Sequence, residues 1–128
     1  MEQHPQRFMT TSEYKVIPQG NLKISKKFFA RGADKILLHS MNVVEDDVIL
    51  RGDLGKISIG NSTIVDSGTV LRPSLTAVPP YDYKMLKIGS NCYIGKNCIV
   101  CALSIGNNVY VGEDCILVNY IITPRLIV

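Results

Sequence analysis

The feature of this 128-residue chain that most limits its fold is a six-residue repeat. Each copy has an aliphatic residue first, usually Gly second, polar residues third and fourth, and a small residue fifth. The six clearest copies form three adjacent pairs, at residues 59–64 and 65–70, 88–93 and 94–99, and 105–110 and 111–116. Internal repeats of this kind predict a solenoid in which each unit packs on its neighbours.

The order of residues within a repeat has a physical explanation. Gly and Asn tolerate the backbone angles of a sharp corner, so the second to fourth positions turn the chain. The first position points into a narrow coil, and the fifth points inward again, where a small side chain fits. Three repeats make one triangular coil, and successive coils stack as parallel strands. The sequence therefore predicts an all-β, single-stranded parallel β-helix.

The repeat also predicts which residues stack on one another. The inward residues of three successive coils are predicted to be Ile59, Val65 and Leu71, then Ile88, Ile94 and Val100, then Ile105, Val111 and Leu117. Between Leu71 and Ile88 the chain is longer than one repeat, and this surplus contains Pro79-Pro80. We therefore expect a loop at 73–87 that protrudes from the coil.

The rest of the chain follows the repeat less closely. Short apolar runs at 36–38, 43–44 and 48–50 indicate one or two imperfect coils. We expect residues 1–11 to form a disordered tail and residues 12–118 to form the β-helix domain. Residues 119–128 do not continue the repeat and are expected to be a divergent C-terminal segment. A chain of this length has no room for a separate catalytic module.

Composition and charge exclude several classes of function. Hydrophobic residues make up 46% of the chain and charged residues 20%, so the chain can bury a core. The net charge is +3, and a nucleic-acid surface would carry more charge with interleaved aromatics. We interpret the basic residues between 23 and 35 as a solvated face, with an acidic protein partner as the alternative. Without a membrane-length apolar segment or a signal peptide, we expect a cytosolic protein with no membrane insertion.

Three cysteines raise the question of a metal site. Cys92, Cys98 and Cys115 each occupy the fifth, small position of a repeat. No CxxC spacing and no nearby His pair accompanies them, so we interpret them as core residues. Cys98 and Cys115 are expected on adjacent coils as reduced thiols. We therefore predict no metal and no cofactor.

Catalytic candidates are few. His4 lies in the expected tail, which leaves His39 as the one candidate general base, and a single His before a strand is more often structural. No Gly-rich phosphate loop, nucleophile elbow or carboxylate pair stands out. Arg51-Gly52-Asp53 matches a cell-adhesion tripeptide. Without a secretory route, we expect Arg51 and Asp53 to pair with neighbouring coils or another subunit through charge-assisted hydrogen bonds.

Three motifs together resemble the dynactin subunit 5 family. They are Ser12-Glu13-Tyr14 with Gly20-Asn21, Ile49-Leu50-Arg51-Gly52-Asp53-Leu54, and Val70-Leu71-Arg72-Pro73. The resemblance covers about residues 10–118 and is more specific than the repeats, which many proteins share. It implies a left-handed β-helix that is not an enzyme, with interaction or structural roles for Arg51, Asp53 and Arg72.

The resemblance also implies a place in dynactin, the activator of dynein. A member of this family pairs side by side with dynactin subunit 6 and caps the pointed end of the actin-related filament. Dynactin subunit 4 and the pointed-end actin-related protein lie nearby. The implied role is adaptor and cargo attachment for microtubule transport, in the cytoplasm and at the cytoskeleton. Because the family would continue with further coils, the chain is expected to be a short or C-terminally divergent member.

Two enzyme classes share the repeat and stay open as alternatives. The γ-class carbonic anhydrases hold zinc with three His at a subunit interface. Alignment on the repeats puts Arg72, Lys96 and Cys101 near those positions, where cationic Arg and Lys side chains cannot ligate. A hexapeptide acyltransferase usually needs a well-placed His and a trimer cleft, and His39 alone could serve. The alternative functions are therefore an acyltransferase and an inactive carbonic anhydrase-like protein.

Overall fold

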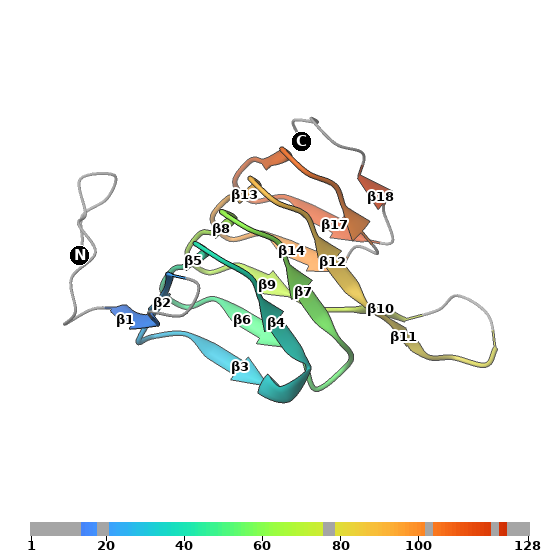
Figure 1. Cartoon of the computed structure of the whole chain (residues 1–128). Coiled ribbons are helices and arrows are strands. Elements are labelled where there is room, and N and C mark those ends of the chain that lie inside the picture. The colour runs from blue at the N-terminus through green and yellow to red at the C-terminus, as the bar shows by residue number, and fades with distance from the viewer. Residues whose placement is uncertain (1–13, 18–20, 76–78, 102–103, 119–120, 123–128) are drawn as a thin grey trace.

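The computed structural model describes residues 14–17, 21–75, 79–101, 104–118 and 121–122. Three sheets, parallel except at β1, wind into a triangular β-helix that rises from the N-terminal to the C-terminal coils in Figure 1. The coil is left-handed (Figure 1), which confirms the expected all-β, left-handed parallel β-helix. Within the described ranges, no helix is long and apolar enough to cross a membrane.

Each sheet takes one short strand from each coil. Sheet A contains Tyr14–Ile17 (β1), Leu22–Ser25 (β2), Val43–Val44 (β5), Ile64–Val65 (β8), Tyr93–Ile94 (β13) and Tyr110–Val111 (β16). Sheet B contains Phe29–Arg31 (β3), Ile49–Arg51 (β6), Val70–Leu71 (β9), Ile99–Cys101 (β14) and Ile116–Val118 (β17). Sheet C contains Ile36–Leu38 (β4), Ile57–Ile59 (β7), Leu86–Ile88 (β12), Ser104–Ile105 (β15) and Ile121–Ile122 (β18). One turn of 3-10 helix, Ala33–Lys35 (η1), precedes β4.

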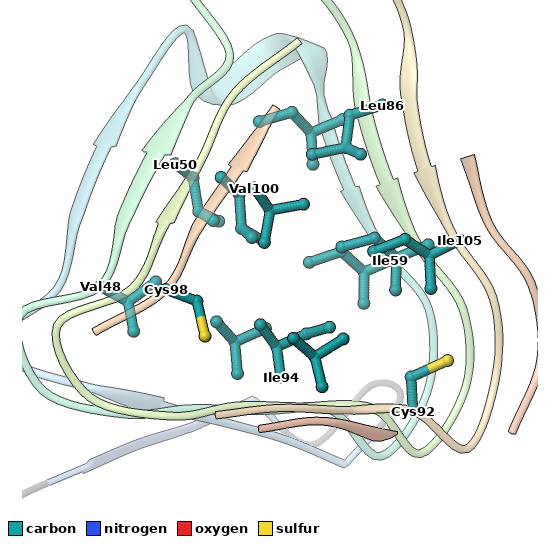
Figure 2. Packing of buried hydrophobic residues seen from close by; sticks show 14 of the residues in the cluster. Val48, Leu50, Ile59, Leu86, Cys92, Ile94, Cys98, Val100 and Ile105 are labelled. Atoms are coloured by element: carbon teal, nitrogen blue, oxygen red, sulfur yellow. The ribbon is translucent and has the colours of Figure 1, made fainter. Parts of the chain in front are cut away.

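The predicted stacking of inward aliphatics is confirmed. Ile88 pairs with Ile59 on one side and Ile105 on the other, and Ile94 pairs in the same way with Val65 and Val111. All of these side chains are buried, and in Figure 2 the inward residues meet in the middle of the triangle. Burial of this column of large aliphatic side chains is the main source of stability for so narrow a fold.

The fourth position of each repeat has a left-handed backbone conformation. Positive φ angles occur there at Ser62, Gly68, Asn91, Asn97, Asn108 and Asp114. The same conformation occurs at Met41 and Asp47, which identifies residues 38–43 and 44–49 as two further repeats. The N-terminal coils are therefore more regular in backbone than their sequence indicates, because their second positions hold His39 and Glu45 in place of Gly.

The fifth position points inward, as predicted, and where it holds Thr or a buried Cys the side chain also donates a hydrogen bond. Thr69 Oγ1 lies 2.6 Å from the carbonyl oxygen of Gly95, and Cys98 Sγ lies 3.0 Å from that of Gly112. In each pair the acceptor is the second residue of a repeat in the next coil. The slot thus accepts small side chains, and Thr and Cys add a hydrogen bond between coils that Val48 and Val109 lack.

The long connection between β9 and β12 leaves the coil as a hairpin. Its two strands, Ser74–Leu75 (β10) and Tyr83–Lys84 (β11), pair antiparallel and extend to the side of the β-helix in Figure 1. The chain rejoins sheet C at Leu86, which pairs with Ile57. At the far end, β18 pairs in parallel with β15. Sheet C therefore continues past residue 118, where the repeat pattern predicts no further strand.

Candidate protein-interaction surface

The outer face of sheet B carries an unbroken column of apolar side chains. Parallel pairing aligns one outward residue from each of five coils: Phe29, Ile49, Val70, Ile99 and Ile116. The exposed fractions of Phe29, Ile99 and Ile116 are 60%, 42% and 65%. Exposed apolar side chains that are aligned along one flat face indicate a site of contact with another protein.

A second column on the same face begins with three arginines. Arg31 pairs with Arg51. Leu71 pairs with Leu50, so Arg72, which follows Leu71, lies beside Arg51 on the next coil. The column continues with Cys101 on the next coil, because the Arg72 N–H donates to the Val100 carbonyl at 2.9 Å. Sheet B therefore presents an apolar strip that is bordered by arginines on its N-terminal coils.

Arg51 and Asp53 form a bidentate ion pair with each other. Arg51 Nε lies 2.9 Å from Asp53 Oδ1, and Nη2 lies 3.0 Å from Oδ2. This hydrogen bonding raises the pKa of Arg51 and lowers the pKa of Asp53. Within this chain the two side chains pair with each other rather than with a neighbouring coil. Their pairing with another subunit stays a prediction.

Gly52 is explained by the close approach of two coils. A Cβ atom at this position would lie 2.7 Å from the carbonyl oxygen of Gly32 and 2.8 Å from that of Arg31. No side chain fits between the coils at that distance. The Arg-Gly-Asp tripeptide is thus a corner of the β-helix, with its glycine required by packing and its charges paired across the glycine.

Arg72 differs from Arg51 in its hydrogen bonding. Its Nε atom is buried and has no hydrogen-bond partner among the described residues. A buried donor without an acceptor costs free energy, and the cost is larger for a charged group.

The residues aligned with the zinc ligands of carbonic anhydrases are not brought together. Arg72 and Cys101 are neighbours on successive coils at one end of sheet B. Lys96 lies at the corner between sheets A and B, where its carbonyl accepts from the Asp114 N–H at 2.9 Å. In the part of the chain that the structure describes, no group of three or more His, Cys, Asp or Glu could hold a metal ion. The absence of zinc remains a prediction.

His39, the candidate general base, is exposed at the end of β4. Its Nδ1 lies 2.8 Å from the carbonyl oxygen of Ile59. A carbonyl can only accept, so Nδ1 carries the hydrogen and anchors the ring to the next coil. This contact gives His39 a structural role at the corner that follows sheet C.

The cysteines lie where the repeat puts them. Cys92 and Cys98 are buried free thiols, and burial raises the pKa of both. Cys115 packs against the core from the coil next to Cys98, since the Ile99 N–H donates to its carbonyl at 2.9 Å. The thiols of Cys92 and Cys98 are therefore core groups that stay protonated near neutral pH.

These features define a class of protein: a hexapeptide-repeat, left-handed β-helix with a flat apolar face suited to protein contact. The same fold occurs in enzymes. AntD, an N-acyltransferase from Bacillus cereus, aligns with a TM-score of 0.67 at 16% sequence identity, covering 84% of this chain and 74% of AntD. Likeness at such low identity shows the fold alone.

The sequence comparisons identify the family. The profile of the family described as Dynactin subunit 5 matches residues 3–124. Dynactin subunit 5 of Dictyostelium discoideum is 36% identical over 99 residues, which are 77% of this chain and 50% of that protein. This chain belongs to the dynactin subunit 5 family. It spans about half the length of the curated relative that it matches.

Proposed function

We propose that this chain is a non-catalytic structural subunit of the dynactin pointed-end complex. In this role it supports the attachment of adaptors and cargo for dynein-driven transport along microtubules, in the cytoplasm and at the cytoskeleton. Membership of the dynactin subunit 5 family supports the link to dynactin. The observation that carries the structural role is the apolar column of sheet B, because it gives the β-helix a flat surface for another subunit.

We assign the outer face of sheet B to dynactin subunit 6, the side-by-side partner that the family resemblance implies. Dynactin subunit 4 and the pointed-end actin-related protein are proposed as further neighbours. Burial of Phe29, Ile99 and Ile116 against a partner would remove their exposed apolar surface from water. A carboxylate on the partner would pair with Arg31, whose side chain is exposed on the arginine border of this strip. The preferred partner surface is therefore apolar with acidic residues along one border.

The lack of catalysis is part of the proposal. His39 uses Nδ1 to bind the Ile59 carbonyl, and its position is explained by that contact. Incubation of the purified chain with acetyl-CoA and a panel of amine acceptors should release no free CoA above the buffer rate. Release that disappears in His39→Ala would contradict a non-catalytic role and favour the acyltransferase alternative.

Binding to dynactin subunit 6 tests the assignment of sheet B. The variant Ile116→Asp should weaken the affinity at least tenfold, because a carboxylate would be buried in the contact. The matched control is Ile64→Asp, which changes an exposed aliphatic on sheet A and should bind within twofold of wild type. Biolayer interferometry on co-folded, immobilised subunit 6 measures both. Equal losses in the two variants would contradict the assignment of sheet B.

A further inference from the structure

A groove of about 580 Å³ crosses the outer face of sheet C on its three N-terminal coils. Its centre is explained by the pairing of outward residues in β4, β7 and β12. Ser58 pairs with Leu37 on one side and with Lys87 on the other. Because Ser is much smaller than Leu or Lys, the column dips at Ser58 and leaves space between two long side chains.

The neighbouring column deepens the groove on one side. Ile36, Ile57 and Leu86 are in register, so the residues just before them, Lys35, Lys56 and Met85, occupy successive coils. All three line the groove. Met85 reaches this position because the β10–β11 hairpin returns the chain to sheet C in register with β7.

The lining combines positive charge with exposed apolar surface. The charged lining residues are three lysines and one carboxylate, which gives a net charge of +2: Lys35, Lys56, Lys87 and Asp34. Two apolar side chains among the lining residues are largely exposed, Leu37 at 56% and Met85 at 45%. The groove therefore offers ammonium groups and a hydroxyl for an anion, and apolar contacts beside them.

We propose that this groove binds an acidic peptide segment of a partner protein, in which carboxylates alternate with apolar side chains. Its carboxylates would pair with Lys56 and Lys87 above the Ser58 hydroxyl, and its apolar side chains would cover Leu37 and Met85. The charge of the lining selects an acidic segment over a basic one. Sheets B and C are different sides of the triangle, so this site and the sheet B contact are separate.

A direct binding measurement on the full chain tests the groove. The probe is a fluorescein-labelled peptide of four Glu-Leu repeats, followed by fluorescence anisotropy at low and physiological salt. Wild type should bind it, and the affinity should fall as salt rises. The double variant Lys56→Glu with Lys87→Glu should bind at least tenfold more weakly. The matched control Lys96→Glu, at a corner away from sheet C, should bind within twofold of wild type.

Two further peptides and one variant complete the experiment. Peptides of four Lys-Leu or four Glu-Ser repeats should bind at least tenfold more weakly than the Glu-Leu peptide. Equal binding of either one, or unchanged affinity in the double variant, would overturn the proposal. Ile116→Asp should keep full affinity for the Glu-Leu peptide even though its affinity for dynactin subunit 6 falls. The groove and the sheet B assignment can therefore fail independently.

Discussion

The N-terminal and C-terminal coils share a backbone geometry but differ greatly in sequence. Residues 88–99 follow the repeat closely, with Gly second and Asn fourth. Residues 38–49 have His39 and Glu45 at the second positions, and Met41 adopts the left-handed conformation that Asn91 adopts later. In the N-terminal coil, Asn42 is also buried at a fifth position with no hydrogen-bond partner for Nδ2 among the described residues.

The comparison teaches which parts of the repeat the fold requires. The aliphatic first position is kept in both regions, since Val44, Val65 and Ile94 are stacked and fully buried. The corner residues vary, because a neighbouring coil holds the corner in place through backbone hydrogen bonds. Weak corners in the N-terminal coils are thus tolerated at some cost in stability.

The largest effect is expected at the shared first position. Ile94→Asp and Val44→Asp each bury an unpaired carboxylate, which should cost several kcal/mol and prevent folding of a marginal domain. Both regions should fail equally, since both side chains are fully buried. Lys96→Asp, at a corner, is the control and should be nearly neutral. Melting followed by circular dichroism checks all three, and a normal melt for Val44→Asp would show that the N-terminal coil adds little to the core.

A smaller effect is expected at the second position of a regular repeat. In Gly95→Ala the new Cβ atom would lie 2.7 Å from the carbonyl carbon of Gly112. Such overpacking should reduce the free energy of unfolding by about 1–3 kcal/mol. Gly55→Ala is the control, because its Cβ would meet side-chain atoms of Pro73 and Tyr83 at 3.3 Å. Urea titration should separate the two variants, and equal midpoints would contradict the tight approach of these coils.

The hydrogen bond of the fifth position should contribute less. Thr69→Val keeps the size of the side chain, as Val109 in the same slot indicates, but leaves the Gly95 carbonyl without its donor. We expect a loss of about 1–2 kcal/mol in the free energy of unfolding, measured by urea titration. Thr69→Ser, which keeps the donor, serves as the comparison. If Val proved as stable as wild type and Ser were worse, packing alone would explain the slot.

The smallest effect should be a gain in stability at Met41. A non-glycine side chain other than Asn or Asp is strained at the φ of 59° found there. Met41→Asn should therefore raise the free energy of unfolding by about 0.5–1 kcal/mol. The reverse change in a regular repeat, Asn91→Met, should lower it by a similar amount. Opposite signs in the two melts are the expected result, and a loss in Met41→Asn would contradict the equivalence of the two corners.

Much of the interior of this protein follows from the sequence by itself. The six-residue period identifies Ile59, Ile88 and Ile105 as one stack and puts Cys92 and Cys98 in the core. Period and register are local properties, since each repeat turns the chain by the same amount and the inward side must be aliphatic. The family motifs around Arg51 and Arg72 carry the resemblance that the sequence comparisons confirm.

The outer surface depends on the tertiary structure. The repeat predicts that Ile99 and Ile116 point outward. Their alignment with Phe29, however, requires the stacking of all five coils. The groove at Ser58 likewise needs the hairpin to return Met85 and Lys87 to the correct coil. The Arg51–Asp53 pair depends on a local corner geometry that residue types alone leave open. A surface joins residues that are far apart along the chain, so its composition is decided only when the coils stack.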